Sequence, residues 1–134
     1  MNLLLDTHVI LWWHSDGERL SGHVAEEIAK AERLLISPLS CWEITTLERQ
    51  GRIALDRDGL QWTGDLMRLP RVVRADLSAE AAAWAGQLET ERFPGDPIDR
   101  LLYATARDLR VPIVSKDDRL RSYAATVGDV DVIW

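Results

Sequence analysis

The chain has 134 residues, 46% of them hydrophobic, a net charge of −6 and one cysteine, Cys41. This length fits one compact domain over residues 1–134, with enough apolar residues for a core that needs no disulfide. No apolar run approaches the roughly 20 residues of a membrane span, and no signal peptide is recognised, so a cytoplasmic location is expected. The negative charge argues against a broad nucleic-acid surface, unless the acidic residues gather in a site that metal ions neutralise.

Short apolar runs alternate with stretches of helical periodicity along the chain. Strands are expected at residues 2–5, 34–36, 71–77, 111–115 and 130–133. Helices are expected at residues 7–13, 22–32, 38–50, 59–69, 79–88 and 97–110. This order predicts an α/β fold: a three-layer α/β/α sandwich with a central, largely parallel sheet of four to five strands.

Four acidic residues fall where such a sheet would bring them together. Asp6 directly follows the first strand, and Asp117 lies two residues beyond the end of the fourth. Glu43 belongs to the helix after the second strand, and Asp99 to the first turn of the helix that leads into the fourth. Ligands of open α/β sheets bind beyond the carboxyl ends of the strands, where strand order reverses, so we expect all four acids at one rim.

Clustered carboxylates repel one another unless a cation lies among them. Mg²⁺ prefers oxygen ligands, takes few of them from protein and keeps several waters. One or two such ions can generate hydroxide and stabilise the leaving oxygen of a phosphodiester. Zinc is not indicated, because His8, His14 and His23 lack the spacing of zinc ligands.

Each acid also has a purely structural interpretation. Asp6, Asp96 and Asp117 can cap the helix or turn that follows them. Asp99 lies three residues after Asp96, as in a capping box, and Glu43 would do the same if its helix began at Ser40. Capping explains any one acid, whereas four acids at one rim favour a site.

Several neighbours are secondary candidates. The hydroxyls of Thr7 and Ser115 either join the site or only end a local element. Arg100 and Lys116 either contact a substrate phosphate or form surface ion pairs. These alternatives stay open on sequence alone.

Four segments resemble one protein family in order and spacing. The segments LLLDTHVILWW, ISPLSCWEITTL, GDPIDRLLYATA and VPIVSKDDRL are similar to the acid-bearing segments of bacterial PIN domains. The similarity is greatest to the VapC toxins of type II toxin–antitoxin systems. The segment Phe93-Pro94-Gly95 departs from many relatives, which place a histidine or basic residue there.

The resemblance implies a PIN fold and a Mg²⁺- or Mn²⁺-dependent endoribonuclease that hydrolyses RNA phosphodiester bonds. It makes Asp6, Glu43, Asp99 and Asp117 the catalytic, metal-binding acids, with Asp96 as a secondary candidate. It also implies inhibition by a cognate antitoxin and pairing into a homodimer. The RNA target and the number of metal ions are left open.

Three other readings compete with this one. A phosphatase of the haloacid dehalogenase type needs a second acid two residues after the first, where this chain has His8. A receiver domain needs paired acids after the first strand and an acceptor near Asp76, and the pair is missing. A non-catalytic PIN-like module that binds RNA or protein would have lost one of the four acids, and none is lost.

Overall fold

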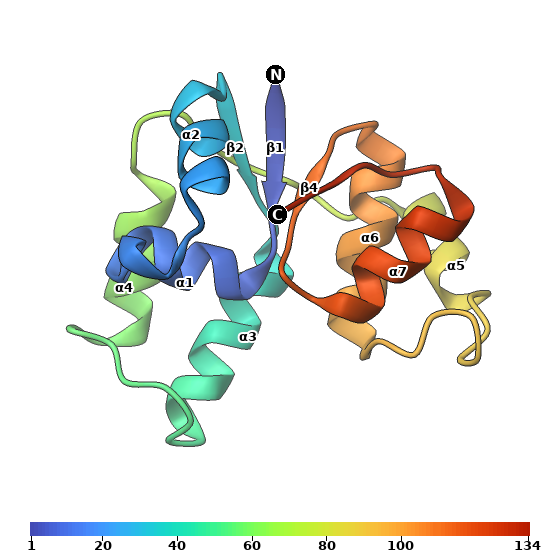
Figure 1. Ribbon diagram of the computed structural model, residues 1–134. Helices are drawn as coiled ribbons and strands as arrows, with labels where there is room; N and C mark the ends of the chain where they lie inside the picture. The colour runs from blue at the N-terminus through green and yellow to red at the C-terminus, as the bar shows by residue number, and fades with distance from the viewer.

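The computed structural model describes residues 1–134, which form one five-stranded sheet between two layers of helices (Figure 1). All neighbouring strands are parallel, in the order β3-β2-β1-β4-β5. The strands are β1 (Asn2–Leu5), β2 (Arg33–Ile36), β3 (Val72–Arg74), β4 (Ile113–Val114) and β5 (Val132–Ile133). The predicted α/β sandwich is therefore confirmed, although three of the five strands are shorter than expected.

Seven α-helices and one short 3-10 helix connect the strands. They are α1 (Thr7–Ser15), η1 (Gly17–Arg19), α2 (Gly22–Lys30), α3 (Pro38–Arg49), α4 (Gly59–Met67), α5 (Ala79–Gly86), α6 (Pro97–Leu109) and α7 (Asp118–Val127). Helix α7 was not predicted, because only Leu120 and Ala124 among its ten residues are buried and its apolar periodicity is weak. None of the helices has the length and apolar character needed to cross a membrane.

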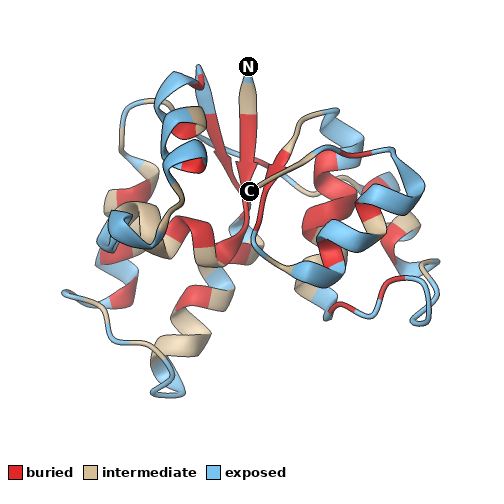
Figure 2. Cartoon of the chain, viewed as in Figure 1, coloured by how far each residue is buried: buried red, intermediate tan, exposed pale blue.

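Successive leucines of β1 point into two different cores. Leu3 and Leu5 pack in one core with residues of α1, α2, α3 and α4, whereas Leu4 packs in a second core with residues of α6 and α7. This alternation follows from the period of two along a strand. Figure 2 accordingly shows buried residues on the strands and on the helix sides that face them. A strand buried on both faces must be apolar throughout, as β1 is.

The reversal of strand order lies between β1 and β4. The chain moves outward from β1 through β2 to β3, then returns through α5 and α6 to add β4 on the other side of β1. Leu5 of β1 pairs with Val114 of β4, so the next residues, Asp6 and Ser115, leave the sheet side by side. The fold thus opens a ligand position at the place that the topology rule predicts.

Candidate active site

A hollow of about 260 Å³ lies at this reversal of strand order. We call it the acid hollow, and five carboxylates contribute to its wall. Its lining residues are Asp6, Thr7, His8, Leu11, Glu43, Leu47, Arg52, Asp96, Asp99, Asp117 and Arg119. The four acids expected at one rim therefore do line one hollow, together with the secondary candidates Asp96 and Thr7.

Asp6 is the most buried of these acids, with 3% of its surface exposed. One carboxylate oxygen, Oδ1, accepts a hydrogen bond of 2.7 Å from the backbone N–H of Thr7 and so caps α1. The other, Oδ2, accepts a bond of 2.6 Å from the Ser115 hydroxyl. Both oxygens are therefore held by short bonds, and the orientation of the carboxylate is set by the fold.

Ser115 connects the carboxyl ends of β1 and β4 at the acid hollow. Its buried hydroxyl donates to Asp6 and accepts a bond of 3.1 Å from the backbone N–H of Asp117. Asp117 in turn caps α7, because its Oδ1 accepts from the Leu120 N–H at 2.9 Å. Ser115 therefore positions two acids although it does not line the hollow itself.

Glu43 reaches the hollow from the second turn of α3. That helix is capped by Ser37, whose hydroxyl accepts from the Leu39 N–H at 3.1 Å, and Pro38 occupies its first turn. The alternative start at Ser40, which would have made Glu43 part of a capping box, is wrong. The Glu43 carboxylate is therefore not needed to cap the start of α3.

The sequence left open whether Asp96 and Asp99 cap a helix or belong to the site, and the structure separates these two roles. Asp96 caps α6 by accepting from the Asp99 N–H at 3.0 Å. Asp99 makes no reciprocal side-chain bond to the Asp96 backbone, so the capping box is only half formed. The Asp99 carboxylate instead faces the acid hollow.

Burial and mutual repulsion perturb the ionisation of three of these acids. Burial raises the pKa of Asp99 to about 7, and the charges of Asp6, Asp96, Asp117 and Glu43 add to the rise. Burial likewise raises the pKa of Glu43, with smaller contributions from Asp96 and Asp6. The pKa of Asp6 is also raised by burial, against the opposing effects of His8 and Ser115. A cation in the hollow would relieve all three.

The donor set suits a hard divalent cation but does not enclose one. No three acidic, histidine or cysteine side chains are placed so that together they could hold one metal ion. Mg²⁺ in proteins is commonly held by one or two carboxylates and several waters, so an open ring of carboxylates fits it. A closed Cys/His site of the zinc type is not present.

The two basic candidates lie outside the hollow. The Arg100 guanidinium donates to three backbone carbonyls of the loop before α6, those of Leu88, Phe93 and Gly95, at 2.7, 2.6 and 3.1 Å. The Lys116 ammonium lies 5.9 Å from the ring centres of Trp12 and Trp134. Arg100 thus holds a loop and does not line the hollow, which favours a supporting role over the phosphate contact or surface ion pair considered from sequence.

Sequence reasoning missed three polar residues of the hollow, His8, Arg52 and Arg119, besides the apolar Leu11 and Leu47. His8 Nε2 accepts a bond of 2.9 Å from the Lys116 backbone N–H, and its Nδ1 lies 3.6 Å from Asp6 Oδ2. Because Nε2 is an acceptor, neutral His8 carries its proton on Nδ1, facing Asp6. The position of His8, two residues after Asp6, could have indicated that it lies at the site, whereas no local pattern points to Arg52 or Arg119.

Fold and site together define a nuclease-type α/β domain with an acidic centre, and comparison identifies its family. Residues 3–126 match the PIN domain model, so the chain belongs to the PIN domain family.

The chain is also similar to named relatives. It is 40% identical over 121 residues to Ribonuclease VapC22 of Mycobacterium tuberculosis (strain ATCC 25618 / H37Rv), covering 90% of this chain and 91% of the relative. Two solved structures share the fold at low identity. VapBC2 from Rickettsia felis bound to a promoter DNA fragment superposes with a TM-score of 0.70 at 15% identity, covering 99% and 98% of the two chains. A toxin–antitoxin complex from Klebsiella pneumoniae superposes with a TM-score of 0.64 at 14% identity, covering 98% and 96%.

Proposed function

We propose that this protein is a metal-dependent endoribonuclease toxin of the VapC type, with Asp6, Glu43, Asp99 and Asp117 as its catalytic acids. The observation that carries the proposal is their convergence: four elements that are separate in sequence each place one carboxylate on the acid hollow. Membership of the PIN domain family and the similarity to a ribonuclease support the same activity.

The four acids would hold Mg²⁺ or Mn²⁺, with Asp96 at the margin. A divalent ion bound there supplies a more acidic water and charge stabilisation for the leaving oxygen of the phosphodiester. The protein's own contribution is orientation. Asp6 and Asp117 each use one oxygen to cap a helix, and Ser115 ties both to one strand end. These bonds fix the direction in which each carboxylate faces the acid hollow, as hydrogen bonds behind metal ligands commonly do.

Partners follow from the same electrostatics. A basic segment of an antitoxin is complementary to the acid hollow when no metal occupies it, and one structural neighbour is a toxin–antitoxin complex. RNA would enter only once cations have reduced the negative charge. We propose that the single PIN domain spans residues 1–134 and acts in the cytoplasm on RNA.

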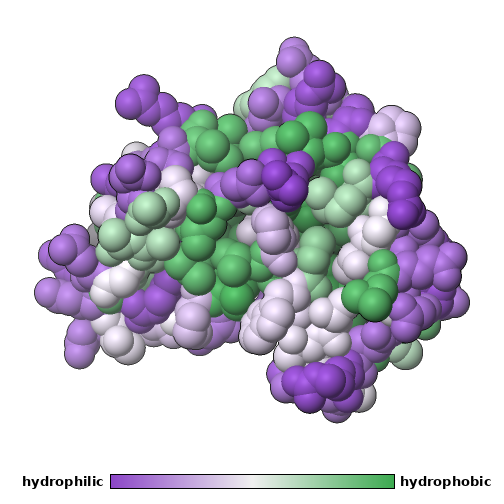
Figure 3. All heavy atoms as spheres, turned by 180° about the vertical axis from the view of Figure 1, so that it is seen from behind, coloured by the Kyte–Doolittle hydropathy of each residue, from purple (hydrophilic) through white to green (hydrophobic).

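A homodimer belongs to the same proposal. Trp42 on α3 and Leu60 on α4 are 60% and 79% exposed, and exposed large apolar side chains often mark protein contacts. Figure 3 shows hydrophobic residues gathered over the middle of the face opposite the view of Figure 1, bordered by hydrophilic ones. Both features leave apolar surface for a second copy or an antitoxin.

The alternative of a non-catalytic binding module is disfavoured by the same hollow, which retains every acid. The receiver-domain reading loses its acceptor, because Asp76 lies in an ion pair of 2.7 Å with Arg74 and does not line the acid hollow. In a non-catalytic module that binds no metal ion, nothing would offset the repulsion among the clustered carboxylates, which lowers the stability of the fold.

The test is cleavage of labelled total RNA by antitoxin-free protein in Mg²⁺, in Mn²⁺ and in EDTA. Asp99→Asn removes one acid of the hollow, and Asp76→Asn is the matched control because it makes the same chemical change at an exposed position. We expect metal-dependent cleavage by the unaltered protein and by Asp76→Asn, and none by Asp99→Asn. Cleavage by Asp99→Asn at the unaltered rate would refute the site. Absence of both cleavage and calorimetric metal binding in the unaltered protein would favour the binding module.

A further inference from the structure

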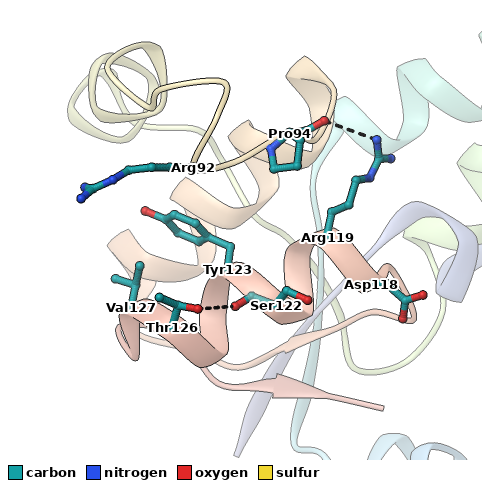
Figure 4. Close-up of a pocket in the computed structure, with 8 residues that line it drawn as sticks. All are labelled: Arg92, Pro94, Asp118, Arg119, Ser122, Tyr123, Thr126 and Val127. Carbon is teal, nitrogen blue, oxygen red and sulfur yellow. Dashed lines mark hydrogen bonds between the residues drawn. The ribbon is translucent and has the colours of Figure 1, made fainter.

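A second hollow adjoins the acid hollow and has a different character (Figure 4). We call it the α7 groove; its volume of about 580 Å³ lies within the range typical of small-ligand sites. Its lining residues are Arg92, Pro94, Asp118, Arg119, Ser122, Tyr123, Thr126 and Val127. They come from α7 and from the loop before α6. Only Arg119 among them also lines the acid hollow.

Arg119 joins the two hollows. It lines both of them, and its guanidinium donates to the Pro94 carbonyl at 3.3 Å and lies 3.6 Å from the Asp117 carboxylate. A polymer with one phosphate among the acids would therefore contact Arg119 where it passes into the α7 groove. The groove is thus continuous with the proposed site of cleavage.

The groove is basic in a protein of net charge −6. Arg92 and Arg119 both present exposed side chains to it, and Figure 4 shows Arg92 extended without a bond to any other residue drawn. The one acid in the lining, Asp118, lies 3.5 Å from Arg121 and is partly neutralised by it. Guanidinium groups suit phosphate oxygens, which they contact in a planar, bidentate manner. Arg92 forms no ion pair, whereas Arg119 lies beside the Asp117 carboxylate.

An aromatic ring forms part of the groove wall. Tyr123 is half-buried, and edge-to-face contacts fix its ring against Phe93 and Tyr103, with ring centres 5.0 and 5.1 Å away. A fixed ring in a wall that also carries guanidinium groups is an arrangement with which proteins bind single-stranded nucleic acids, because every base can stack on a ring.

We propose that the α7 groove is a substrate subsite that binds a nucleotide of single-stranded RNA next to the scissile phosphate. Arg119 and Arg92 contact backbone phosphates, and the Tyr123 ring contacts a base. The inference rests on the proposed ribonuclease function, since it names the substrate contact of the same site.

The experiment measures binding of a fluorescein-labelled pool of random 12-nucleotide RNA by fluorescence anisotropy over a series of salt concentrations. The proteins carry Asp99→Asn so that the RNA is not cut, and Mg²⁺ is present throughout. Arg92→Ala is compared with Arg33→Ala, which removes the same charge from an exposed residue at the amino end of β2, on neither hollow. Tyr123→Leu removes the ring and retains apolar volume, and thermal unfolding checks that each variant is folded.

We expect Arg92→Ala to raise the Kd about tenfold and to reduce the slope of log K against log salt by about 0.7, the effect of losing one phosphate contact to a single strand. We expect Tyr123→Leu to raise the Kd about tenfold with the slope unchanged. Arg33→Ala is expected to change neither quantity. In the active background, Arg92→Ala is expected to raise KM and leave kcat unchanged.

Equal binding by Arg92→Ala and Arg33→Ala would overturn the subsite, and so would failure of the parent protein to bind the pool. Displacement of the RNA by an octaglutamate peptide at equal charge would assign the groove to an acidic peptide and overturn it as well. Because Arg92 is exposed, we expect Arg92→Ala to fold, so it still tests the subsite if Tyr123→Leu does not fold. RNA binding that depends on Arg92 without any metal-dependent cleavage would instead refute the ribonuclease proposal alone.

Discussion

Replacing Asp99 by Asn should stabilise the metal-free protein while it abolishes the proposed activity. In the fold, burial and four neighbouring carboxylates raise the pKa of Asp99 from 3.8 to about 7. Between these pH values the folded protein keeps a proton that the unfolded chain has released. The free energy of unfolding therefore falls as pH rises through this window, and the contribution is lost above about pH 7.

The shift from 3.8 to about 7 sets an upper limit of about 4 kcal/mol on the cost of ionising Asp99 in the fold. The side chain is only partly buried, so water screens part of the repulsion and about 2 kcal/mol is expected. Asn keeps the shape and carries no charge. The variant should therefore match the unaltered protein near pH 4 and exceed its stability by about 2 kcal/mol at pH 8, a rise of roughly 6–10 °C in Tm.

Urea unfolding in EDTA, repeated from pH 4 to pH 8, measures this difference. Asp76→Asn is the control, because the same substitution outside the hollow should leave the pH dependence unchanged. Addition of Mg²⁺ at pH 8 should stabilise the unaltered protein and reduce its disadvantage relative to Asp99→Asn. Parallel stability curves for the two proteins across the whole pH range would refute the reasoning that the acids of the hollow destabilise one another.

Three further substitutions test how the site is supported. Ser115→Ala removes the hydroxyl that orients two acids and should lower Mg²⁺ affinity and cleavage about 10- to 100-fold; the control is Ser15→Ala, at an exposed position outside both hollows, and an unchanged metal titration would contradict this role. Gly95→Ala would place a methyl group against the Phe93 ring and 3.2 Å from the Asp99 Cβ, so thermal unfolding should show a loss of about 1–3 kcal/mol. Arg100→Ala should cost about 2 kcal/mol through three lost carbonyl bonds, yet leave the salt slope of RNA binding unchanged; a reduced slope would restore its phosphate role.

Local patterns were sufficient for much of the fold. The leucine run before Asp6 is apolar at every position because β1 is buried on both faces, and that property is visible in sequence. The helix that begins at Pro97 was recognisable from its cap and apolar stripe. Helix α7 escaped prediction because its apolar stripe is narrow and most of its residues face solvent.

The sequence by itself determined the fold class and was sufficient to predict that four acids meet at one rim, because both follow from short-range signals: the alternation of elements, and the position of each acid relative to a strand end or helix start. Only the tertiary structure decided which nearby residues serve the site. Arg100 lies next to Asp99 in sequence yet turns to loop carbonyls, whereas Arg119 crosses to the rim of two hollows. A long side chain can reach several neighbours from one backbone position, so its partner depends on which elements pack beside it, and no local pattern encodes that choice.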